Sequence, residues 1–213
     1  MKVSIAAAAA VLACSCSSTV LVQVPPRMQL DRAQTIGIVA FEVADAAGGA
    51  PNVSTRFVEA IQHGQPGVAV VELGSSAALL GAVGRSELDR DALREIGRKY
   101  ELDAVLVGAL RMHEQQPRLD VDLDQGFELG AVRAQVRLDG NLEAKLVDTE
   151  RGATVWSGSS ARWIELASVS GDSAGFGSVS VADRQRQVER LVGDMIAEAS
   201  ADFRPSYERR RVD

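Results

Sequence analysis

The only cysteines of the chain, Cys14 and Cys16, are its strongest candidates for covalent chemistry, because a thiol is a good nucleophile. Both follow a short leader in which Lys2 precedes an apolar run over residues 3–13, interrupted only by Ser4. A charged start, a short apolar core and small residues at its end are typical of a bacterial secretory signal. The run is too short to span a bilayer as a helix, which takes about 20 apolar residues.

A cysteine directly after such a core, followed by small polar residues, resembles the lipobox of bacterial lipoproteins. The resemblance implies cleavage before the cysteine and attachment of diacylglycerol to its sulfur, with further acylation such as palmitate. Two frames fit, ending at Cys14 and at Cys16. We favour Cys16, because cleavage before Cys14 would leave an unusually short signal. The alternative is an ordinary signal peptide that is cleaved nearby.

The composition limits the function classes that remain. Without the leader the body has no cysteine, so it has no disulfide and depends on an ordinary packed core. A hydrophobic content of 46% and a charged content of 24% are globular values. The formal net charge of −6 argues against nucleic-acid binding, which needs a basic surface. We expect a lipid-anchored protein of the outer membrane that faces the periplasm and uses no cofactor and no metal.

The pattern along the chain predicts one α/β (α+β) domain with a mixed sheet flanked by helices. We divide the chain into a signal over residues 1–15, a tether over 16–34, the domain over 35–204 and a basic tail over 205–213. Residues 19–24 of the tether could add a small edge strand. Expected strands cover 35–41, 68–73 and 103–110, and expected helices cover 52–63, 75–83, a segment from about 89 to 100, and 182–203.

The clearest periodic signal lies between Val132 and Leu146, where even positions are small or apolar and odd positions are polar or charged. Strict period two predicts a long strand with one buried face, bent at Gly140. A turn over 148–152 and a return strand over 153–157 complete a predicted antiparallel hairpin. The Ser- and Gly-rich stretch 168–180 is typical of a loop.

Three segments carry a family resemblance: the strand 36–41, the helix-to-strand passage 96–108 and the hairpin 142–157. In order and spacing they resemble the envelope lipoproteins grouped around the curli secretion component CsgG, the peptidoglycan-synthase activator LpoB and the amino-terminal domain of TolB. The resemblance implies a non-catalytic role in assembly or regulation of cell-wall synthesis or secretion. The implied partner is a peptidoglycan synthase, a secretion machine or a second copy of the chain.

The alternative function is an oligomeric curli-type secretion pore, in which residues 112–146 form a membrane-inserted hairpin. That region has sufficient length, but Phe127 is its only aromatic residue. The second stretch available for insertion, 157–181, is dominated by Ser, Gly and Ala, which makes a poor lipid-facing surface. We therefore expect a periplasmic domain in preference to a pore.

Other candidate sites have simpler explanations. The acidic run Asp120–Asp124 does not match a calcium loop, because that loop needs glycine at its sixth position and glutamate at its twelfth. His63 and His113 are isolated, and Ser160 is not in a G-x-S-x-G motif, so we expect no catalytic residue.

The tryptophans and the C-terminal arginines are expected to serve structure or surface contacts. Trp156 and Trp163 should pack over the sheet, although Trp163 beside Arg162 could form an exposed contact. Arg209–Arg211 is expected to be a solvated tail, with contact to anionic lipid or cell-wall carboxylates as the alternative.

Overall fold

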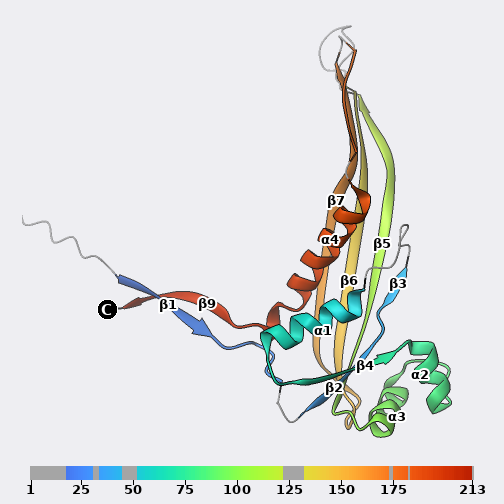
Figure 1. Ribbon diagram of the computed structural model, residues 1–213, viewed down its shortest axis with the longest axis vertical. Helices are drawn as coiled ribbons and strands as arrows, with labels where there is room; N and C mark the ends of the chain where they lie inside the picture. The colour runs from blue at the N-terminus through green and yellow to red at the C-terminus, as the bar shows by residue number, and fades with distance from the viewer. Residues whose placement is uncertain are drawn as a thin grey trace, which may run out of the picture.

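The computed structural model describes residues 18–30, 34–44, 52–121, 132–172, 175–181 and 183–212. Most of it is built on a seven-stranded mixed sheet (Figure 1). In spatial order the strands are β4 (Ala69–Gly74), β2 (Thr35–Val39), β5 (Ala104–Val121), β6 (Val132–Asp148), β7 (Ala153–Asp172) and β8 (Gly175–Val181), with β3 (Glu42–Ala44) also beside β5. β2 is parallel to β4 and β5, and β5 to β8 are antiparallel.

Helices pack on both faces of the sheet. α1 (Val53–Gly64), α4 (Arg184–Ala199) and the short 3-10 helix η1 (Ala201–Phe203) cover one face. α2 (Ser76–Val83) and α3 (Arg90–Tyr100) cover the other face at the β2–β5 end. Side chains of Asn52, Ser75, Asp89 and Asp183 accept backbone hydrogen bonds at the four α-helix starts, which explains why each begins there. The mixed sheet with flanking helices confirms the predicted fold class.

The larger core lies between the sheet and the α1–α4 pair. The strands contribute Ile36, Ile38, Leu106, Leu110, Leu142 and Leu146, and the helices contribute Phe57, Ile61, Leu191 and Met195. Trp156 belongs to this core, with its ring centroid 4.5 Å from that of Phe203 and 6.3 Å from that of Phe57. The prediction that Trp156 packs over the sheet is therefore confirmed.

The period-two pattern places side chains as predicted along β6. Leu138, Leu142, Ala144 and Leu146 are buried beneath the helices, while the charged side chains alternate to the opposite face. Gly140 lies on the buried side, where an added Cβ would come within 2.8 Å of the Met195 sulfur. Glycine here lets α4 approach the strand closely.

β1 (Ser18–Val24) and β9 (Ser206–Val212) form a separate antiparallel ribbon that projects from the body (Figure 1). β1 lies in the segment that we assigned to the tether, and β9 lies in the segment that we assigned to the basic tail. Both strands contact chiefly each other. The two ends of the described chain are thus held together.

The prediction of a loop over residues 168–180 is wrong. The end of β7 and most of β8 occupy this stretch, and they pair from Ala167↔Val181 to Asp172↔Gly175. Strand preference depends more on the partner backbone than on composition, so small polar residues can complete a ladder that a neighbouring strand offers. β5 is also longer than predicted, because β6 continues to pair with it as far as Val121.

Candidate interaction surfaces

The predicted lipidation residues, Cys14 and Cys16, lie outside the described residues. The described chain begins at Ser18, the first residue of β1, which is two residues after Cys16. An extended chain covers at most about 3.5 Å per residue, so β1 starts within about 7 Å of the Cys16 position. Any anchor at Cys16 is therefore attached to the outer end of the β1–β9 ribbon.

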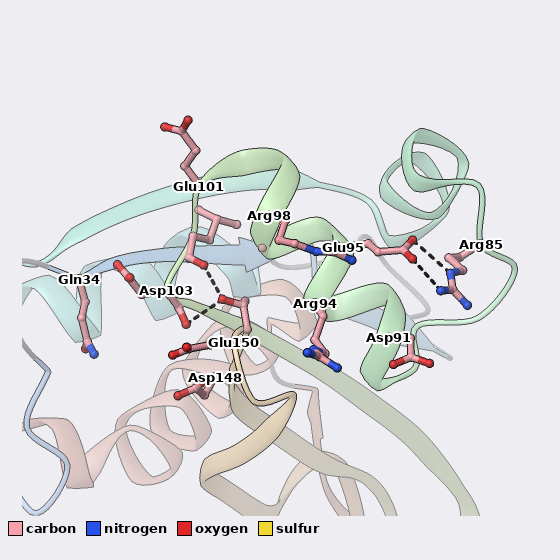
Figure 2. A pocket seen from close by; sticks show the side chains of 13 residues that line it. Gln34, Arg85, Asp91, Arg94, Glu95, Arg98, Glu101, Asp103, Asp148 and Glu150 are labelled. Atoms are coloured by element: carbon pink, nitrogen blue, oxygen red, sulfur yellow. Dashed lines mark hydrogen bonds and ion pairs between the residues drawn. The ribbon is translucent and has the colours of Figure 1, made fainter.

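A charged groove of about 930 Å³ lies where α3 meets the β6–β7 turn (Figure 2). Asp103, Asp148 and Glu150 lie close together beside the turn, and Arg94 and Arg98 lie along α3 (Figure 2). Thr149 attaches the turn to the segment between α3 and β5, because its buried hydroxyl donates to the carbonyls of residues 102 and 103. Gly97 permits this approach, since an added Cβ would come within 2.3 Å of Thr149 Cβ.

Four of the charged side chains that line this groove bond to other groups of the protein. The Arg85 guanidinium binds both carboxylate oxygens of Glu95, at 2.6 and 3.1 Å, and this hydrogen bonding lowers the pKa of Glu95. Asp103 accepts a hydrogen bond from the Thr35 amide, and Asp148 accepts one from the Arg151 amide. These bonds and those of Thr149 make the groove a structural junction between α3 and the β6–β7 turn.

A second surface is formed by the outward side chains of β6 and β7, which we call the open sheet face. It comprises Arg137, Asp139, Glu143, Lys145, Trp163 and Glu165, all exposed or half-exposed. Trp163 is 56% exposed, which is unusual for the largest side chain. In the described part of the chain no helix packs against these six residues.

The exposed tryptophan is held in place by a chain of polar contacts. The Arg137 guanidinium lies 4.0 Å from the centre of the Trp163 ring, a cation–π arrangement. Arg137 also pairs with Asp139 at 3.4 Å, and the Gln115 side-chain amide donates to the same carboxylate. Because these groups come from three strands, the contacts hold the ring in one orientation on the sheet.

Arg162, the sequence neighbour of Trp163, is on the other side of the sheet. Successive strand residues point to opposite faces, so Arg162 points toward α4, where it binds Glu198 at 2.8 Å. The Ser160 hydroxyl donates to the same carboxylate at 2.7 Å. The hydrogen bond from Ser160, and then that from Arg162, lower the pKa of Glu198. The cation beside Trp163 is thus Arg137, which the sequence analysis did not identify.

The remaining candidates are dispersed. His63 is exposed near the end of α1, and His113 is exposed on β5 at the register position of Asp139. Asp122 and Asp124 of the acidic run lie outside the described residues. Within the described ranges there is no group of three potential metal ligands, and no helix has the length and apolar character needed to cross a bilayer.

Comparison with known proteins gives distant structural similarities. No protein-family model matches the chain, and no curated protein matches it. The fold is similar to that of PelC from Paraburkholderia phytofirmans, solved as a dodecamer, with 15% identity over 86% of this chain and 97% of that chain and a TM-score of 0.42. It is also similar to the LpoB C-terminal domain from Salmonella enterica (16% identity, 61% and 82% coverage, TM-score 0.35).

A third similar structure is lipoprotein GNA1162 from Neisseria meningitidis, with 16% identity, coverage of 76% of this chain and 96% of that chain, and a TM-score of 0.34. LpoB is one of the proteins that the sequence resemblance named, whereas membership of the CsgG and TolB group stays a prediction. Since these TM-scores are under 0.5, the function is argued from this chain's own residues.

Proposed function

We propose that this protein is a non-catalytic lipoprotein of the bacterial outer membrane, whose periplasmic domain binds an envelope protein through the open sheet face. The partner would be a peptidoglycan synthase or a component of a secretion machine. The observation that carries the proposal is the exposed Trp163 ring on Arg137, above a sheet whose other face is covered by helices. Tryptophan and arginine are the residue types that contribute most to protein–protein binding energy.

The lipobox-like leader supports the anchored location, and the start of β1 close behind it supports attachment through the ribbon. Globomycin, which blocks lipoprotein signal cleavage, tests the anchor together with Cys14→Ala, Cys16→Ala and the double variant. We expect Cys16→Ala to release the protein from membranes and Cys14→Ala to leave it attached. If the double variant still fractionates with membranes like the wild type after a high-salt wash, which removes attachment through charge alone, the anchor is wrong.

The partner surface is tested by cross-linking in cells followed by quantitative capture. Trp163→Ala should reduce the captured partner about 30-fold, the effect of losing about 2 kcal/mol of binding energy. Tyr100→Ala is the matched control, because Tyr100 is also an exposed aromatic residue beside a cation, with Lys99 6.0 Å from its ring centre. Equal capture by wild type and Trp163→Ala would contradict the proposal.

The alternative, a secretion pore with residues 112–146 inserted in the membrane, is favoured by the length of β5 and β6. Against it, Met112, Leu138 and Leu142 of this segment are buried in the core. Glu114 at its start pairs with Arg184 on α4 at 2.6 Å. The described part of the segment therefore supports a role in the domain's own sheet.

A further inference from the structure

The β1–β9 ribbon carries a second surface whose chemistry differs from that of the body. In its register Leu21 is opposite Arg209, Thr19 is opposite Arg211 and Gln23 is opposite Tyr207. Directly opposed residues in an antiparallel pair point to the same side, so these six side chains share one face. Leu21 and Tyr207 are each 65% exposed, and both arginines are exposed.

The two faces of the ribbon differ in their charge balance. On the other face Arg210 pairs with Glu208 at 3.8 Å, so its charge is partly compensated. Arg209 and Arg211 have no ion-pair partner among the described residues. An aliphatic side chain, a tyrosine and two uncompensated arginines together are the composition found where proteins meet the headgroup region of a bilayer.

The position of this face, close to the predicted lipid anchor, indicates that a membrane surface is what it contacts. If the anchor is at Cys16, β1 begins within about 7 Å of it, and with Cys14 the distance is at most about 14 Å. Strand pairing then brings the chain's C-terminal arginines to the same end, because Arg211 is opposite Thr19. With the ribbon lying along the membrane surface, both guanidinium groups would come within the range where phosphate charges act, about 10 Å at 0.1 M salt.

We infer that the face formed by Leu21, Tyr207, Arg209 and Arg211 binds the surface of a bilayer that contains anionic phospholipid. This inference rests on the proposed anchor for its place in the cell, but the chemistry of the face is independent of acylation. The acyl chains would hold the protein to the membrane, and this face would add electrostatic attraction to anionic headgroups. It also orients the body, because the ribbon and the long strands project in different directions (Figure 1).

The test uses the unacylated chain that begins at Ser17, which keeps every described residue. Its binding to sedimented vesicles of phosphatidylethanolamine and phosphatidylglycerol is measured at 50 and 300 mM salt, with phosphatidylcholine vesicles as the neutral surface. We expect binding to the anionic vesicles only, weaker at the higher salt. Arg209→Gln/Arg211→Gln should weaken it about 25-fold, at about fivefold for each arginine.

The matched control is Arg186→Gln/Arg190→Gln, which removes the same charge from exposed positions on α4. It should bind within about twofold of the wild type, since these side chains are remote from the ribbon. Equal losses in the two double variants would overturn the inference, as would wild-type binding by Arg209→Gln/Arg211→Gln or no binding to anionic vesicles.

Two other occupants of this face are outcomes of the same experiment. Binding to isolated cell-wall sacculi is measured in the same way as binding to vesicles, and self-association is measured by analytical ultracentrifugation. If Arg209→Gln/Arg211→Gln loses sacculus binding or self-association but keeps vesicle binding, the inference is overturned. Because the chain carries no lipid, failure here leaves the membrane-fractionation test of the cysteines unaffected. The two proposals can therefore fail separately.

Discussion

At the scale of single residues, Thr149 shows how one hydroxyl can join two elements. Its hydroxyl donates to the carbonyl of residue 102 at 2.5 Å and to that of Asp103 at 3.0 Å, and its amide also donates to the Asp103 carbonyl at 3.0 Å. Both acceptors lie in the segment between α3 and β5. The residue is buried, so water cannot replace these bonds. Thr149 thus keeps the β6–β7 turn against the helix.

We predict that Thr149→Val lowers the free energy of unfolding by about 1–2 kcal/mol, because a buried carbonyl loses its donor while the shape is conserved. Urea denaturation at pH 7 measures this change. Thr154→Val, on the exposed start of β7, is the control and should change stability by less than about 0.5 kcal/mol. Equal effects of the two variants would contradict the role of Thr149.

Glu198 gives a pH-dependent prediction. Its pKa in the folded protein is below the ordinary value of 4.5, because Ser160 and Arg162 donate hydrogen bonds to it. The stability that ionised Glu198 gives the folded protein is therefore fully present above pH 4.5, and it is lost as the pH falls through the lower pKa of the folded state. The Tm difference between wild type and Glu198→Gln should shrink over that acid range. Ser160→Ala removes the hydrogen bond that lowers the Glu198 pKa most, so it should reduce the pH dependence of Tm. A Tm difference between wild type and Glu198→Gln that stays constant from pH 7 to pH 3 would contradict the prediction.

At the scale of elements, the ribbon and the body are energetically separate. β1 and β9 contact chiefly each other, whereas the preceding η1 inserts Phe203 fully into the core beside Trp156. An isolated two-stranded ribbon is only marginally stable in water. The ribbon therefore adds little to the stability of the domain, consistent with a role in contacts.

We predict that ending the chain at Pro205 changes the free energy of unfolding by less than about 1 kcal/mol, as is typical of exposed changes. Phe203→Ala, two residues earlier, should cost about 3–5 kcal/mol because it leaves a cavity beneath α4 and Trp156. Guanidinium denaturation monitored by tryptophan fluorescence compares them. A loss from truncation as large as that of Phe203→Ala would show that the ribbon is part of the folded core.

At the scale of the whole molecule, three features lie on different parts of the structure. The ribbon, which follows the predicted anchor, projects from one side of the body, and the long strands β5 to β7 extend away in another direction (Figure 1). The open sheet face lies along β6 and β7, two of the strands that extend away from the ribbon (Figure 1). A domain attached by its ribbon would thus hold the open sheet face away from its point of attachment.

We predict that the chain beginning at Ser17 stays in solution without detergent. The segment that the pore alternative would insert, residues 112–146, carries ion pairs such as Glu114–Arg184 and Arg137–Asp139 on its described part. Analytical ultracentrifugation without detergent and negative-stain electron microscopy measure this. Rings that form only in detergent would instead support the secretion-pore alternative.

The sequence alone determined the features that depend on residues close together along the chain. The leader and its cysteines predict export, and the alternation from Val132 to Leu146 predicted the buried face of β6. Helix starts at Asn52 and Asp89 were also predictable, since a capping side chain acts within three residues of its own position. Such local rules need no knowledge of distant partners.

Only the tertiary structure decided which distant segments meet. Trp163 is held by Arg137 instead of its neighbour Arg162, because the β6–β7 register places Asp139 opposite Trp163 and alternation turns Arg162 away. The Ser- and Gly-rich stretch became strand, and Arg209–Arg211 came to lie beside β1, for the same reason. Strand pairing is set by hydrogen bonds to whichever backbone lies adjacent, and the free energy of that choice depends on the whole fold.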